Sequence, residues 1–518
     1  MITKKFLLKP FFVACALICT GGLIIEKTFN SFTTLVAKND LKEINNSSQD
    51  RNSTLLIGLR SHIGKSLIEN GVISRIKLAS NGRQLFLKDR NGIIVKSNQI
   101  IISWKKIPLT SPKVFNRKVS SSFASFESAE RLADDLRSKG FDPLIANPKG
   151  WEIWLSESSA IPEGNKFSQI SVVRSYELKP ILNNLDQDIL LSGPIEIEAP
   201  DGLLWNGGVY FGPFILQTDS YGTWTFIEKV PIERYLLGVV PYEIGQNAPQ
   251  SAIAAQAVLA RTWALANSHR YAIDGYNLCN HTQCQVYKSP VLANKAVSNA
   301  ILMTKGKYLS WRKEPIHAVY HASNGGVMAA SQEAWAMDSL PYFKSRLDGS
   351  EKWVNNFQLP LKNDLQVKSF LEQKKWAYGN EYYRFRWKRN LSDAQIRDAL
   401  TNFTDSSFLP KKLQVLKRGD SGRVLSLSIE GESAEKKVVL ELDEIRRVFK
   451  SLPSTLFVIQ KLRENVWAFS GGGFGHGVGL SQVGAIDLAS RGWNAKKILK
   501  YYYPGTTYRS LPLLPKDP

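Results

Sequence analysis

The sequence is poor in the residues that form disulfide scaffolds or metal clusters. It has four cysteines and six histidines in 518 residues, and Cys15 and Cys19 lie in an apolar N-terminal segment. Only Cys279 and Cys284 remain for the folded body, which can therefore contain at most one intramolecular disulfide.

Arginine-rich tracts and nucleic-acid-reading motifs are also missing, although the chain is basic. Lys and Arg outnumber Asp and Glu by 67 to 46, which gives a net charge of +21 spread along the chain. This balance favours an anionic partner such as lipid head groups or an acidic cell-wall polymer. Without a reading motif we expect no nucleic-acid partner.

Long apolar runs are confined to the N-terminus. Three lysines among the first nine residues precede an apolar run from Phe11 to Ile25, which predicts a signal peptide or signal anchor over residues 1–27. It lacks a clean A-x-A cleavage site, and no other stretch is long enough to span a membrane. We expect the body to lie in the cell envelope, outside the cytoplasmic membrane, secreted or attached by this segment. The polar residues 28–53 predict a tether.

The glycine-rich stretch GGGFGHGVGLSQVGA (471–485) has none of the common glycine motifs. It lacks the G-K-[ST] of a phosphate-binding loop, the spacing of a dinucleotide fingerprint and the G-x-S-x-G of a hydrolase elbow. Glycine allows close backbone approach, so the stretch predicts a loop packed against another part of the chain.

The pattern over the first half predicts small α+β units. Alternating apolar residues indicate a β-rich module over 54–112, with a hairpin turn at residues 90–92. In residues 113–160 we expect a helix that opens at Ser125 or Glu127 and closes at Gly140, with strands at 121–124, 144–146 and 152–155. This pattern resembles a SPOR domain, which implies binding of peptide-stripped glycan; a spacer without a ligand is the alternative.

The clearest helix is expected between Pro249 and Ser268. Its alanine-rich sequence has apolar residues on every side, which predicts a buried helix. Gln256 and Arg261 are unusual in such a helix, because a buried arginine must be paired or must face a cleft. A structural ion pair and a groove position both remain open for Arg261.

Six motifs in order resemble the SpoIID/LytB family, named after stage II sporulation protein D and the amidase enhancer. They are VPIERYLLGVVPYEI (230–244), AIAAQAVLARTWAL (252–265), CNHTQCQVYKS (279–289), AVYHASNGG (318–326), AWAMDSLPYF (334–343) and the segment from residue 471 to 508. The resemblance implies a mixed α+β domain over 161–510, with a supporting subdomain inserted at 350–465 and a tail at 511–518. The whole chain is thus expected to be a multidomain α+β protein.

The resemblance implies a peptidoglycan lytic transglycosylase that cleaves MurNAc–GlcNAc bonds, preferably in peptide-stripped glycan strands, and leaves 1,6-anhydroMurNAc ends. One carboxyl group serves first as general acid and then as base, so the chemistry needs no cofactor. The alternative is a non-catalytic glycan-binding accessory that stimulates a cell-wall amidase. The expected partners are glycan strands, the membrane through the N-terminal segment and, in the accessory alternative, a cell-wall amidase.

Glu243 matches the catalytic position of the family. Tyr242, Ile244 and the long helix offer apolar surroundings that would raise its pKa. A lone Glu before a helix is otherwise usually a partner of the helix dipole. Glu233, ten residues upstream, is the second candidate, with a structural role expected.

Further polar residues are expected to line a substrate groove, each with a structural hydrogen bond as its alternative. They are Gln256, Arg261, Tyr287, Ser323, His476, Ser481 and Gln482.

Cys279, His281 and Cys284 form a C-x-H-x-x-C pattern, which is not a standard zinc spacing. Some family members bind zinc near such a pair, which implies a possible structural zinc ion here. In an oxidising compartment a Cys279–Cys284 disulfide is the alternative, and free thiols are the third case.

Overall fold

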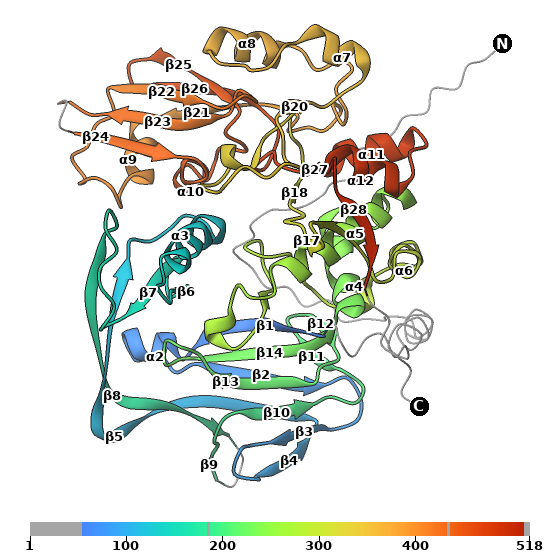
Figure 1. Ribbon diagram of the computed structural model, residues 1–518. Coiled ribbons are helices and arrows are strands. Elements are labelled where there is room, and N and C mark those ends of the chain that lie inside the picture. The colour runs from blue at the N-terminus through green and yellow to red at the C-terminus, as the bar shows by residue number, and fades with distance from the viewer. Residues whose placement is uncertain (1–53, 184–186, 433–435, 512–518) are drawn as a thin grey trace.

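The computed structural model describes residues 54–183, 187–432 and 436–511. The expected signal segment, the tether and the tail beyond residue 511 lie outside these ranges. Within them the chain is a multidomain α+β protein, as predicted (Figure 1). Over the described ranges no helix is both long and apolar enough to cross a membrane.

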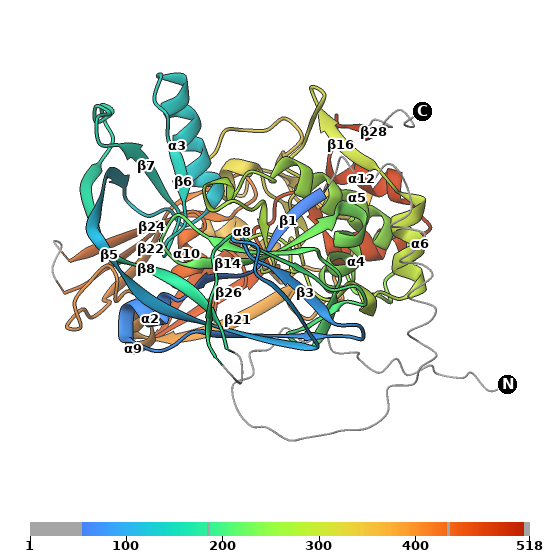
Figure 2. The ribbon, with the colours of Figure 1, turned by 90° about the horizontal axis from the view of Figure 1, so that it is seen from below.

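Two large sheets form the base of the molecule (Figures 1 and 2). The first has the strand order β15 (Leu278–Cys279), β1 (Thr54–Ile63), β14 (Trp224–Pro231), β13 (Phe214–Thr218), β10 (Ile195–Glu198), β3 (Leu85–Lys88) and β4 (Ile94–Ser97). The second has the order β12 (Gly208–Tyr210), β11 (Leu203–Trp205), β2 (Arg75–Ser80), β5 (Gln99–Ser120), β7 (Glu152–Ser156) and β6 (Leu144–Ala146), with β8 (Phe167–Leu182) joining β5 to β9 (Ile189–Leu190).

The strands of region 54–112 do not form a sheet of their own. β1 pairs antiparallel with β14, and β3 pairs with β10 as well as with β4 across the expected hairpin. β5 runs past residue 112 and pairs with β8 along most of its length. The boundaries expected at 112 and 160 therefore do not separate sheets, because alternation identifies a strand without identifying its partner.

A small α+β unit stands at the far end of the long β5–β8 ribbon (Figure 1). Its helix α3 (Phe126–Ser138) begins after Ser125, whose hydroxyl accepts the N–H of Ser128 at 3.3 Å. The helix and the strands β6 and β7 confirm the pattern read from the sequence. The expected strand at 121–124 is reduced to a single bridge between Phe123 and Trp151.

A helical layer packs beside the first sheet. α5 (Gln250–Ala266) begins after Pro249 and is buried nearly all round, as predicted. It contacts α4 (Ile232–Glu243), α6 (Lys295–Met303), α11 (Gln482–Ser490) and α12 (Ala495–Tyr502). α4 was not predicted, because Gly238 and Pro241 interrupt its helical pattern. Gly238 is required by packing, since a Cβ there would overlap Tyr287, and Pro241 lies in the last turn.

The region from about 350 to 472 forms the upper part of the molecule in Figure 1, with its own apolar cores. Its sheets are β21 (Arg386–Ser392), β26 (Val466–Gly472) and β25 (Phe457–Arg463), and β22 (Lys412–Arg418), β23 (Val424–Glu430) and β24 (Lys437–Glu441). Its helices are α7 (Glu351–Asn356), α8 (Asp364–Glu372), α9 (Asp393–Ala399) and α10 (Glu444–Val448). Because β26 pairs with both β21 and β25, this sheet continues past the boundary expected at 465.

Short strands connect this upper part to the helical layer. They are β16 (Lys307–Trp311), β17 (Glu314–Pro315) and β28 (Thr507–Ser510), β18 (Tyr320–His321) with β27 (Leu480–Ser481), and β19 (Val327–Met328) with β20 (Arg346–Leu347). The parallel pair β18–β27 matters most for function, because it brings the glycine-rich segment beside Tyr320.

Candidate active site

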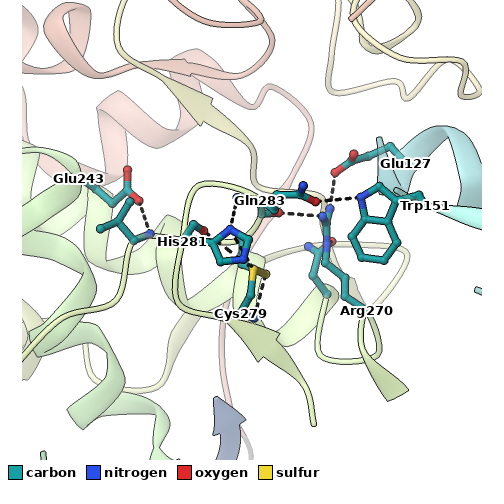
Figure 3. The surroundings of a disulfide bond; sticks show 10 residues. Glu127, Trp151, Glu243, Arg270, Cys279, His281 and Gln283 are labelled. Carbon is teal, nitrogen blue, oxygen red and sulfur yellow. Dashed lines mark hydrogen bonds and ion pairs between the residues drawn. A yellow bond between two sulfur atoms is a disulfide. The ribbon is translucent and has the colours of Figure 1, made fainter. Parts of the chain in front are cut away.

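Glu243 is the last residue of α4, before the turn that leads to α5, and does not lie at the start of α5. Its Oε1 accepts the N–H of Val286 at 3.0 Å, from the loop that follows the cysteine pair (Figure 3). α5 begins only at Gln250. A role as dipole partner of α5 is therefore not supported, because the backbone N–H that Glu243 accepts belongs to another segment.

Burial raises the pKa of Glu243 to about 7, although hydrogen bonds with Val286, Tyr320 and Gln482 act in the opposite direction. The C-terminal end of α4 carries partial negative charge, which also disfavours an ionised carboxylate. A carboxyl group in this state can donate a proton near neutral pH, as a general acid requires.

A chain of hydrogen bonds leads from α5 to the Tyr320 hydroxyl beside Glu243. The amide Nε2 of Gln285 donates to the carbonyl of Ala260 at 3.1 Å, so its Oε1 faces Tyr320. The Tyr320 hydroxyl donates to this Oε1 at 3.0 Å. Its oxygen can then accept a proton from Glu243, and it can donate to an ionised carboxylate only by giving up Gln285.

The glycine-rich segment packs directly against the strand that carries Tyr320. Gly479 has a φ of 74°, and a Cβ there would overlap the carbonyl of Val319. This close approach lets Leu480 pair with Tyr320 and leaves Gln482 in contact with Glu243. The loop predicted from glycine content is thus packed beside the candidate acid.

His476, in the same segment, holds the backbone of Tyr320. Its Nδ1 accepts the N–H of Val478 at 3.1 Å, so the proton is on Nε2, which donates to the Tyr320 carbonyl at 2.9 Å. Burial lowers the pKa of His476 to about 3, which keeps the ring neutral. His476 is therefore suited to position Tyr320, not to exchange protons.

Glu243 opens into a cleft of about 520 Å³. Its walls come from α3 and its neighbouring strands, from the helical layer with the 282–286 loop, and from α10 with the glycine-rich segment. The aromatic lining residues are Phe126, Trp151, Trp263, Tyr320 and Trp335. Flat aromatic faces among a few polar groups suit a ring-shaped organic ligand such as a sugar.

The α3 unit is fixed to the cleft by polar contacts (Figure 3). Arg270 forms an ion pair with Glu127 and donates to the carbonyl of Gln283 at 3.0 Å. Trp151 Nε1 donates to the Gln283 side chain at 2.9 Å. The unit that resembles a SPOR domain therefore supplies one wall of this cleft.

Gln256 and Arg261 were expected to line a substrate groove, but neither residue lines the cleft. Arg261 is fully buried and forms an ion pair with Glu233, with N–O distances of 2.8 and 2.5 Å. Arg261 therefore forms a structural ion pair, which was its alternative role, and Glu233 is its partner. Gln256 is fully buried in α5, and among the described residues its amide atoms have no hydrogen-bond partner.

Tyr287, Ser323 and Ser481 also lie outside the cleft lining. The Tyr287 hydroxyl donates to buried Glu228 at 2.8 Å. Ser323 pairs through its backbone with Phe474, and the Ser481 hydroxyl accepts the N–H of Gly484 at the start of α11. Each makes the structural hydrogen bond that was the alternative, because sequence motifs mark tightly packed positions as readily as exposed ones.

Cys279 and Cys284 form a disulfide. His281 lies beside it, with Nδ1 3.9 Å from Cys279 Sγ. Joined sulfurs are not the thiolates that zinc requires, so this donor set does not fit a zinc ion. In the ranges that the structure describes, no group of three or more His, Cys, Asp or Glu could hold a metal.

Several cleft residues were missed by sequence reasoning. Tyr320 and Gln285 lie inside quoted motifs, next to residues that were chosen, so their signal was available. Trp151 comes from a distant segment, as do Asp443, Arg446 and Arg447 at and before α10. Only the fold brings them to Glu243.

Fold and site together define a multidomain α+β protein whose cleft presents a protonatable carboxyl group among aromatic side chains. Residues 220–311 match the family model described as stage II sporulation protein. Residues 329–479 match a model described as a domain of unknown function. These matches support the resemblance of the chain to the SpoIID/LytB family.

Curated relatives agree with this resemblance. The chain is 29% identical over 300 residues to the amidase enhancer of Bacillus subtilis, an alignment that covers 53% of this chain and 40% of that protein. It is 27% identical over 299 residues to stage II sporulation protein D of the same organism, covering 54% of this chain and 75% of that protein. An uncharacterized protein of Brachyspira hyodysenteriae is 27% identical over 317 residues, covering 60% and 75%.

We predict that Glu243→Gln changes stability in a pH-dependent way. The pKa of Glu243 is higher in the folded protein, at about 7, than its ordinary value of 4.5. The wild type should therefore lose free energy of unfolding as pH rises from about 4.5 to 7, by up to about 3 kcal/mol, whereas Gln does not titrate. Denaturant titrations of both proteins at pH 4 and pH 8 measure the gap. A gap that is the same at both pH values would contradict a raised pKa.

We also predict that the cysteine pair is oxidised and free of zinc. The peptide that contains both residues should gain about two daltons on reduction. Replacing both with Ala should cost about 2 kcal/mol, because the bond closes only a short loop. One equivalent of zinc by elemental analysis, with both thiols alkylatable in the native protein, would contradict the disulfide.

Proposed function

We propose that this protein is a peptidoglycan lytic transglycosylase with Glu243 as its general acid and base. The observation that carries the proposal is a carboxyl group with a pKa of about 7 in an aromatic cleft. The other carboxylates that line the described cleft, Glu127 and Asp443, each form an ion pair with an arginine. One protonated carboxyl suits a reaction in which a single group gives and then takes a proton, whereas a hydrolase normally needs two.

The reaction follows from this one group. Protonated Glu243 gives its proton to the glycosidic oxygen as the bond from that oxygen to C1 of MurNAc breaks. The resulting carboxylate takes the proton of the 6-hydroxyl of the same sugar, whose oxygen bonds to C1. The products are a 1,6-anhydroMurNAc end and a free GlcNAc hydroxyl. The acid is regenerated and no water is consumed.

Tyr320 and Gln482 hold the carboxyl in place during both steps. Tyr320 can accept from the neutral acid, and Gln482 contacts the same carboxyl. His476 holds Tyr320 through its carbonyl. These groups are positioning residues in the proposal, because they act through Glu243.

The resemblance to the SpoIID/LytB family supports a cell-wall substrate and a location in the cell envelope. Peptide-stripped strands are the preferred substrate in our proposal, with the N-terminal segment as signal or anchor. The α3 unit would bind glycan as part of the cleft wall, since Trp151 and Phe126 line it.

A second function is favoured by one relative, the amidase enhancer. In this alternative the cleft binds glycan without cutting it, and the protein stimulates a cell-wall amidase. The two functions share glycan binding and differ only in whether the strand is cleaved.

The deciding experiment gives the full chain peptide-stripped glycan strands and analyses the ends by mass spectrometry. We expect 1,6-anhydroMurNAc ends, and we expect Glu243→Gln to lower their rate of formation at least about 100-fold while strand binding remains, because Gln has no acid proton. Glu233→Gln is the matched control and should retain cleavage in the fraction that folds. Reducing ends would indicate hydrolysis. No product, together with an accelerated amidase, would favour the accessory function.

A further inference from the structure

The cleft beside Glu243 contains three arginines, and they differ in their partners. Arg270 pairs with Glu127, and Arg447 pairs with Asp443 at 3.1 Å. Arg446 lines the same cleft, yet among the described residues its side chain makes no hydrogen bond and no ion pair. Its Nε is buried without a partner. The residue as a whole is half-buried, and a partly desolvated guanidinium without a partner carries a free-energy cost that a bound anion would offset.

Arg446 lies close to the residues that hold the candidate acid. Its charge lowers the pKa of both His321 and His476, and His476 donates to the carbonyl of Tyr320. Asp443 attracts Arg446 but is engaged by Arg447. The positive charge therefore faces the cleft near the reacting position and is not neutralised by a contact pair.

The chemistry of the proposed substrate offers one suitable anion. GlcNAc is uncharged, whereas MurNAc carries a lactyl ether that ends in a carboxylate. A stem peptide converts this carboxylate to an amide, and removal of the peptide restores it. An arginine fork binds a carboxylate through charge-assisted hydrogen bonds that an amide cannot match.

We propose that Arg446 is a specificity-determining residue that binds the free lactyl carboxylate of MurNAc in peptide-stripped strands. The inference rests on the proposed function and adds a physical reason for its preferred substrate. It also gives a role to α10, which lies within the stretch that matches a domain of unknown function. The upper part of the molecule would then select the substrate that Glu243 cleaves.

The test measures binding alone. The full chain carrying Glu243→Gln is titrated by calorimetry with peptide-stripped strands, and with the same strands after conversion of their carboxylates to methylamides. We expect about 10- to 100-fold tighter binding of the acidic strands, the range of hydrogen bonds to charged groups. Added Arg446→Gln should reduce this ratio to about one while leaving the affinity for neutral strands unchanged.

Two further variants make the test specific. Arg446→Lys keeps the charge and should retain part of the discrimination. Arg389→Gln, on the exposed surface of β21 in the same subdomain, is the matched control and should retain all of it. If Arg446→Gln does not fold, the ratio in the parent and in Arg446→Lys still decides. Equal binding of acidic and neutral strands by the parent, or discrimination that survives Arg446→Gln, would overturn the proposal.

The result of this binding test can be distinguished from the result of the cleavage test of the proposed function. Carboxylate discrimination without anhydro products from the wild type would contradict cleavage and support the subsite. Anhydro products formed equally from acidic and neutral strands would support cleavage and overturn the subsite.

Discussion

A hydrogen-bonded chain of neutral groups joins the buried helix α5 to the carboxyl of Glu243. It runs from the Ala260 carbonyl through Gln285 to the Tyr320 hydroxyl, and His476 holds the backbone of Tyr320. Because the Gln285 amide nitrogen donates to the Ala260 carbonyl, its amide oxygen accepts from the Tyr320 hydroxyl. The carboxyl of Glu243 ends the chain, where hydrogen bonds with Val286, Tyr320 and Gln482 lower its pKa. Burial outweighs these hydrogen bonds and favours the neutral carboxyl group.

The cleft around this chain depends on three regions that are distant in sequence. The α3 unit is attached through Glu127 and Trp151, the helical layer supplies Glu243, and α10 brings Arg446. The disulfide closes the loop whose Val286 N–H contacts the acid. A substrate in this cleft would touch all three regions at once. The α3 unit, the helical layer and α10 therefore form walls of one cleft.

Local sequence patterns predicted the positions of helices and strands well, but they did not predict which strands pair. The helix after Ser125 and the buried helix after Pro249 follow from the residues that begin them and from apolar spacing. α4 was missed because glycine and proline usually interrupt a helix. Here Gly238 is required by close packing against Tyr287, and Pro241 lies in the last turn. The pairing of β1 with β14 could not be foreseen, since strand alternation is the same for any partner.

For the site, motif resemblance located Glu243, His476 and Gln482, which the fold brings together. It could not separate them from Arg261 or Tyr287, because buried structural pairs occur in the same motifs. Arg446 had no signal in the sequence at all. Its position follows from the packing of α10 over the cleft.

The central claim is that Glu243 acts in its protonated form with a pKa of about 7. The most direct measurement is the pH dependence of kcat/KM for cleavage of peptide-stripped strands. Because the proton donor is lost as pH rises, we expect kcat/KM to fall above about pH 7, approaching a tenfold loss per pH unit. A rate that stays constant up to pH 9, or that already falls above pH 4.5, would contradict the account.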